Sequence, residues 1–143
     1  MNALNNVPRL LTYSLLAVLI FQGLSGLAGG FGLVGDPSGA ALGMPLEWLD
    51  GSPFSTYLVP GLILLVVLGI GPLIVAFMVV RAKTGAGWAS VATGIALLVW
   101  IGVEVAIIGY QPFPPQVPFQ ILYGAVGAII LALGLRYRSR LSA

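Results

Sequence analysis

The chain has 143 residues, of which 59% are hydrophobic and only 7% are charged, and its formal net charge is +2. Since a soluble domain carries about 25% charged residues, this composition excludes a soluble globular protein and indicates an integral membrane protein. The sequence contains no cysteine and no histidine, which excludes disulfides, thiol chemistry and the usual ligands of haem, zinc and copper. We therefore expect no cofactor and no metal site.

Four apolar segments are separated by polar, glycine-rich or proline-rich turns. Each segment approaches or exceeds the length of about 20 residues that crosses a bilayer as a helix. The pattern predicts an all-α integral membrane protein, a four-transmembrane-helix bundle that forms one domain over residues 1–143. The predicted spans cover residues 10–34, 54–80, 88–109 and 118–135.

The first predicted span has a second interpretation, a secretory signal peptide cleaved near Ala28. A basic residue precedes its apolar run, and the small residues GLSGLAGG end the run. The apolar stretch nevertheless continues through FGLVG, which is long for a signal peptide and suits a membrane span. We interpret the segment as a span.

The loop after the first span contains a predicted short helix at the membrane interface. Pro45 suits the first turn of a helix, and Leu46 and Leu49 would share one face. Trp48 favours the headgroup level of a bilayer. An ordinary connector and a lid over the bundle both remain open as roles for this segment.

Pro72 lies deep in the second predicted span, within the stretch LGIGP. Proline lacks a backbone N–H and its ring clashes with the preceding turn, so we expect a kink near this point. The kink is either static, with its released carbonyl groups satisfied by neighbouring groups, or a hinge.

Small residues mark the places where helices in lipid approach closely, because lipid tails provide no hydrophobic force between helices. We predict contact faces at small residues four apart in the first, third and fourth spans, either inside one bundle or between copies of the chain. These pairs are Gly26 and Gly30, Gly102 and Ala106, and Gly124 and Ala128.

The charged residues divide between the two sides of the four-span arrangement. All six basic residues fall on one side, which the positive-inside rule assigns to the cytoplasm, so both termini are predicted inside. We expect a multi-pass protein of a bacterial inner (plasma) membrane, and the basic tail is too short to indicate a nucleic-acid partner. The basic residues are Arg9, Arg81, Lys83, Arg136, Arg138 and Arg140, and the acidic residues of the outer loop are Asp36, Glu47 and Asp50.

The fourth acidic residue, Glu104, lies inside the third predicted span, about 9 Å below its outer boundary by helical rise. Trp100 and Gln111 share its helical face. An ionised carboxylate without a basic partner is strongly unfavourable in lipid. We therefore expect Glu104 to be protonated and hydrogen-bonded, unless water or an external cation reaches it. Other spans offer polar side chains at similar depth, namely Tyr57, Gln120, Tyr123 and Gln22.

These seven polar residues constitute a predicted pocket that opens toward the outside. Three roles for Glu104 remain open: a neutral clasp between helices, a site for a substrate or proton, and a contact with another subunit. The bilayer is the expected environment, and a homo-oligomer or a larger membrane complex is compatible with the sequence.

Three functional hypotheses follow. The first is a non-enzymatic bundle, either an accessory subunit or a protein that binds a lipid or small ligand around Glu104. The second is an oligomeric proton- or cation-coupled small transporter or channel that uses Glu104. The third is an intramembrane enzyme, for which no His, Cys or second nearby carboxylate completes a catalytic group, so we assign no catalytic residue.

The transporter hypothesis agrees with a resemblance in general plan. In the number of spans and in carrying a membrane glutamate, the chain resembles the small multidrug transporters. The acid of that family lies in the first span, where this chain has Gln22, and the loops of that family are shorter. The resemblance therefore implies a four-span plan and does not transfer the activity.

Overall fold

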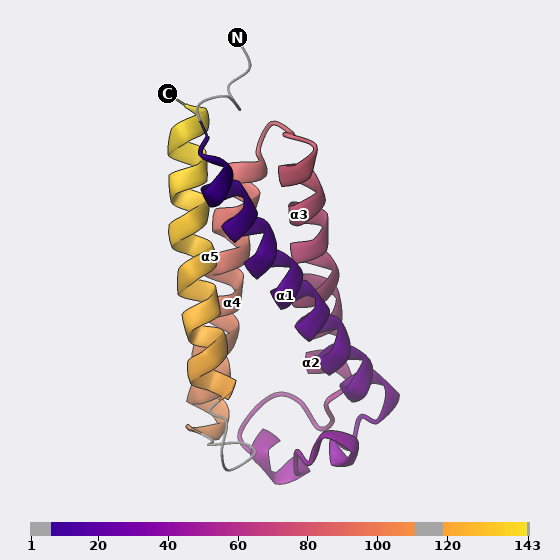
Figure 1. Ribbon diagram of the computed structural model, residues 1–143. Coiled ribbons are helices and arrows are strands. Elements are labelled where there is room, and N and C mark those ends of the chain that lie inside the picture. Colours follow the sequence, from indigo (N-terminus) through magenta and orange to yellow (C-terminus); the bar gives the residue numbers. More distant parts are fainter. Residues whose placement is uncertain (1–6, 111–118, 143) are drawn as a thin grey trace.

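The computed structural model describes residues 7–110 and 119–142 and shows an all-helical protein (Figure 1). Four helices are long and apolar enough to cross a membrane, as the sequence predicts, and they indicate a multi-pass membrane protein. The second of these spans is divided by a π-helical segment. The elements are α1 (Arg9–Gly35), the 3-10 turns η2 (Ala40–Leu42) and η3 (Leu46–Leu49), α2 (Leu58–Leu65), the π segment η4 (Val66–Ile70), α3 (Gly71–Val80), α4 (Ala86–Ile108) and α5 (Phe119–Leu141).

The charged residues are segregated between the two ends of the bundle. The start of α1, the turn between α3 and α4 and the end of α5 all lie at one end (Figure 1), and these segments carry all six basic residues. Asp36, Glu47 and Asp50 belong to the loop between α1 and α2 at the opposite end. Hereafter the end with the acidic loop is called the outer end.

The α5 helix extends to Leu141, beyond the predicted boundary at residue 135. The end of an apolar stretch does not by itself end a helix. Tyr137, beyond that stretch, continues the buried face of α5 and has no exposed surface. The guanidinium carbon of Arg138 lies 3.8 Å from the ring centroid of Trp88 on α4, a cation–π contact that holds the last turns together. The basic residues therefore belong to the helix rather than to a tail after it.

The α1 helix packs closely against the second span. A Cβ atom added at Gly30 would lie 2.6 Å from the Cα of Leu65, and one added at Gly26 would overlap the carbonyl oxygen of Leu68. These glycines let the two backbones approach each other, which is the usual basis of close packing in lipid. The predicted contact face at Gly26 and Gly30 is confirmed.

The pairs predicted for the third and fourth spans do not form contacts within the bundle, and the alternative of a contact between copies stays a prediction. Nothing lies within 4 Å of a Cβ added at Gly102, and the nearest atom to one at Gly124 is Ile101 Cγ2, at 3.9 Å. The partners Ala106 and Ala128 are exposed. Both helices are apolar on all sides, so small residues at a spacing of four did not identify the face that turns inward. The glycines at the α4–α5 contact are Gly87, Gly94, Gly127 and Gly134.

The loop between α1 and α2 is held by hydrogen bonds of its own side chains. The carboxylate of Asp36 accepts hydrogen bonds from Ser38 Oγ at 2.6 Å and from the Ala41 N–H at 2.9 Å. The Ser38 hydroxyl and the Ala41 N–H hold the pKa of Asp36 below its ordinary value. The predicted short helix is present as the single 3-10 turn Leu46–Leu49, with Leu49 buried.

Pro72 produces a break in the second span, in the form of the π segment Val66–Ile70 directly before it. In an α-helix the carbonyl of Leu68 would accept a hydrogen bond from residue 72, and proline has no N–H to donate. Gln22 Nε2 on α1 donates to that carbonyl oxygen at 3.2 Å. A neighbouring helix thus satisfies the carbonyl that Pro72 leaves open, which lipid could not do.

Gly26→Ala is expected to destabilise the bundle by about 1–3 kcal/mol, because the added methyl group would overlap the backbone of the second span. Reversible unfolding in mixed micelles measures the change. Gly102→Ala is the matched control and should change stability by less than about 0.5 kcal/mol, since its methyl group meets open space. Equal losses for both variants would contradict the close approach of α1.

Gln22→Leu is expected to cost about 1 kcal/mol of unfolding free energy, because it removes the side-chain donor to the carbonyl of Leu68. The same change should cost clearly less in a Pro72→Ala background, where the backbone again offers an N–H to that carbonyl. A double-mutant cycle of unfolding free energies measures this coupling. A cost that is the same in both backgrounds would show that Gln22 does not compensate for Pro72.

Candidate functional site

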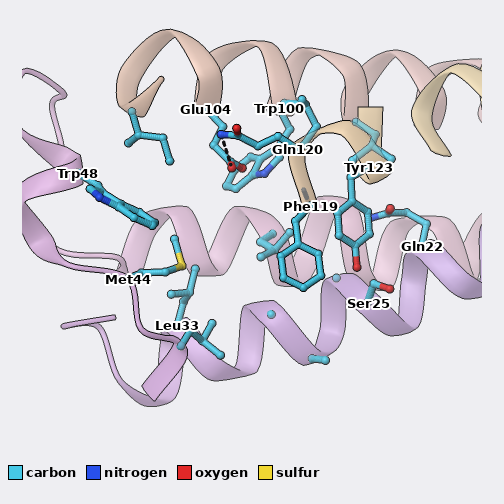
Figure 2. A pocket seen from close by; sticks show the side chains of 18 residues that line it. Gln22, Ser25, Leu33, Met44, Trp48, Trp100, Glu104, Phe119, Gln120 and Tyr123 are labelled. Carbon is cyan, nitrogen blue, oxygen red and sulfur yellow. Dashed lines mark hydrogen bonds between the residues drawn. The ribbon is translucent and has the colours of Figure 1, made fainter. Parts of the chain in front are cut away.

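A cavity of about 470 Å³ lies toward the outer end of the bundle, between α1, α4, α5 and the loop that follows α1. Most of its wall is apolar, and a few polar side chains face it from three helices (Figure 2). The apolar lining includes Leu33, Leu64, Leu97, Ile101 and Ile108.

The cavity exists for two reasons. The α1 helix leans toward the second span, and α1 carries small residues where it faces α5. In Figure 1, α1 crosses the bundle obliquely, from near α5 at its start to near α2 at its end. Ser25, Ala28 and Gly29 line the cavity from α1. Side chains this small do not fill the space that opens as the helices diverge.

Glu104 lies on the cavity wall four residues before the end of α4, which is about 6 Å by helical rise. Its Oε1 accepts a hydrogen bond from Gln120 Nε2 at 3.2 Å, and the same nitrogen donates to the carbonyl of Gly109 at 3.0 Å. Gln120 is 4% exposed and lies in the first turn of α5. The contact that a clasp between helices requires is therefore present, and the carboxyl group also faces the cavity.

The electrostatic surroundings of Glu104 contain no compensating cation from the described part of the chain. The basic residues lie at the opposite end of the bundle, and within residues 7–110 and 119–142 the side-chain donors to the carboxyl group are the neutral groups of Gln120 and Trp100. Trp100 lies one turn deeper on the same helix and also lines the cavity. A neutral carboxyl group is the form that this apolar setting stabilises, unless an occupant of the cavity carries a positive charge.

A second polar group of side chains lies deeper, on the α1 side. Gln22 is 1% exposed, and its Oε1 has no hydrogen-bond partner within the described residues. The Tyr123 ring stacks on Phe21 with a centroid distance of 6.2 Å and on Phe119 with the same distance. These aromatic contacts place Tyr123 against α1, in the neighbourhood of Gln22 and Ser25 (Figure 2).

Five of the seven predicted pocket residues line this one cavity: Gln22, Trp100, Glu104, Gln120 and Tyr123. Gln111 lies outside the described residues. Tyr57 does not line the cavity, because its side chain is buried against Leu33 and Leu49.

The phenolic hydroxyl of Tyr57 donates to the carbonyl of Pro45 at 2.8 Å, and burial raises the pKa of this phenol. Depth along the helix placed Tyr57 correctly at the outer end, and its hydrogen bond to Pro45 holds the hydroxyl group in the loop rather than on the cavity wall.

Sequence reasoning missed several lining residues. Ser25 follows Gln22 by three residues and therefore shares its helical face, which is a usable signal. Phe119 lies one turn before Tyr123, on the same side of α5. Met44 and Trp48 reach the cavity from the loop, where no helical period predicts the direction of a side chain.

Comparisons with protein-family models, with curated proteins and with solved structures gave no match to this chain. The fold and the site define a helical, multi-pass membrane protein with an apolar cavity and two groups of polar side chains on its wall. The interpretation of the site therefore depends on its own geometry.

Proposed function

We propose that the protein is a non-enzymatic membrane protein that binds an amphiphilic lipid or small ligand in this cavity, alone or as a subunit of a larger complex. The cavity is the observation that supports the proposal. Its volume of about 470 Å³ is within the range of about 300–1,000 Å³ that is typical of ligand sites, and so is the combination of apolar walls with a few convergent polar groups.

The proposal places the ligand in the outer leaflet. Under the positive-inside rule the end that carries the six basic residues is cytoplasmic, with both termini inside. Glu104, about 6 Å from the end of α4, then lies near the outer headgroup region. An amphiphile with its polar groups between Glu104 and Gln22 and its chain between α1 and α5 would occupy this leaflet.

The walls of the cavity favour entry from the membrane between α1 and α5. Ala28 on α1 and Phe119 on α5 both line the cavity and are exposed, with Phe119 37% exposed. In a membrane such surface faces lipid tails. A lipid chain can therefore enter sideways, without first crossing the aqueous phase.

Ala28→Phe should fill the mouth of the cavity and lower the amount of co-purified amphiphile at least tenfold, because the added ring competes for the same space. The measurement is mass spectrometry of molecules released from protein isolated in native membrane discs. Ala92→Phe is the matched control, since Ala92 is exposed on α4 and does not line the cavity. Equal recovery from the wild type and both variants would refute binding in this cavity.

A second function, proton- or cation-coupled transport by an oligomer, is supported by one observation. Glu104 lines the cavity, and its side-chain donors in the described chain are the neutral groups of Gln120 and Trp100, so its carboxyl group can exchange a proton with an occupant or with water.

Glu104→Gln should abolish pH-driven flux of a lipophilic cation in proteoliposomes if the transport proposal is correct, because the amide cannot take up or release a proton. The control is Glu47→Gln, an acidic residue in the exposed loop. Flux that persists in the Glu104→Gln variant, or that is absent from the wild type, would exclude this second function.

A further inference from the structure

The inner polar group of the cavity, formed by Gln22, Ser25 and Tyr123, indicates the class of ligand. We infer that the ligand is an uncharged, hydroxyl-bearing lipid whose hydroxyl group donates a hydrogen bond to Gln22 Oε1. This inference rests on the proposed function and extends it, because it names the chemistry that the inner end of the cavity recognises.

The orientation of the Gln22 amide is fixed by its partner on the second span. The carbonyl of Leu68 can only accept, so the nitrogen of the amide must point to it. The oxygen is then the free end of a side chain that lines the cavity and is 99% buried, with no partner within the described residues. A buried acceptor without a donor is unfavourable, and an occupant of the cavity can supply the donor.

Two hydroxyl groups accompany this acceptor. Ser25 lies three residues after Gln22 on the same face of α1. Tyr123 stacks on Phe21, which is four residues before Ser25. Figure 2 shows the Tyr123 hydroxyl directed toward α1, close to Ser25, and neither the Tyr123 nor the Ser25 hydroxyl makes a hydrogen bond within the described part of the chain. A ligand hydroxyl both donates and accepts, so it can bond to Gln22 and to one of these groups.

The charges around this inner group favour a neutral ligand. Gln22, Ser25 and Tyr123 are uncharged, and the basic residues lie at the ends of helices. An anionic headgroup would therefore find no cation here, and an ammonium group at Gln22 would find no carboxylate at that depth. An isolated charge is strongly disfavoured in such surroundings.

The depth of the two polar groups sets the spacing of polar atoms in the ligand. Gln120, which bonds to Glu104, and Tyr123 are three residues apart on α5, a rise of about 5 Å. A ligand with a carbonyl near the protonated Glu104 and a hydroxyl a few bonds away matches this spacing. Monoacylglycerols carry this combination, with an acyl chain that would lie between α1 and α5.

The test compares a photoreactive monoacylglycerol with its dimethyl ether, which keeps the acyl chain and ester but has no hydroxyl donor. The full-length protein is reconstituted in phosphatidylcholine discs, and affinity is measured by competition for cross-linking. We expect the wild type to bind the monoacylglycerol about tenfold more tightly than the ether. Gln22→Met should reduce this ratio to about one while leaving the affinity for the ether unchanged.

Two further variants separate a binding role of these side chains from a structural one. Tyr123→Phe keeps the aromatic stack and should lower the preference for the hydroxyl several-fold, with unchanged thermal stability. Tyr13→Phe is the control, because Tyr13 is 66% exposed on α1 and is not part of the cavity. If Gln22→Met lowers thermal stability, the ratio of the two affinities still reports on the hydroxyl donor.

Each outcome has one meaning. Equal binding of the monoacylglycerol and the ether, blocked by Ala28→Phe, would overturn the hydroxyl inference and leave the proposed cavity function intact. It would also indicate that only water satisfies Gln22. Tighter binding of an alkylammonium amphiphile than of the monoacylglycerol would overturn the neutral class. If neither probe binds and no amphiphile is retained, both the inference and the proposed function fail.

Discussion

The close approach of α1 to the second span is the contact on which the rest of the structure depends. Gly26 and Gly30 bring the two backbones together, and the approach lets Gln22 reach the carbonyl of Leu68. It also draws the outer half of α1 away from α5 (Figure 1). The cavity is the space left by this divergence, lined by residues of α1 too small to fill it. In a bilayer, where packing rather than water exclusion holds helices together, the direction of one glycine face thus decides where a ligand can fit.

The outer end of the bundle combines a structural contact with an accessible polar group. Gln120 joins the last turn of α4 to the first turn of α5 through Glu104 and Gly109. The same side chain also lines the cavity. A clasp and a binding group are therefore compatible roles of Glu104: the clasp fixes the position of the carboxyl group, and a group in a fixed position binds at a smaller entropic cost.

The sequence was sufficient for features that depend on distance along the chain and insufficient for those that depend on rotation about a helix. Hydropathy located the four potential spans, the basic residues grouped at one end, and helical rise placed Glu104 and Gln120 at a common depth. The polar stripe of Trp100 and Glu104 identified the side of α4 that faces the cavity, whereas the pairs of small residues did not identify the contact between α4 and α5, because both helices carry small residues on more than one side. Tyr57 was expected at the pocket, but a loop hydrogen bond to Pro45 directs it elsewhere.

The polarity at the inner end of the cavity has its origin in a residue that does not line it. Pro72 cannot donate a hydrogen bond to the carbonyl of Leu68, and the amide of Gln22 donates to it. An amide whose nitrogen donates to such a carbonyl carries its oxygen on the other side of the group. The Gln22 oxygen at the inner end of the cavity can thus be a by-product of the hydrogen bond that Gln22 donates to the backbone. A binding site of this kind could arise in evolution before there was a ligand to select for it.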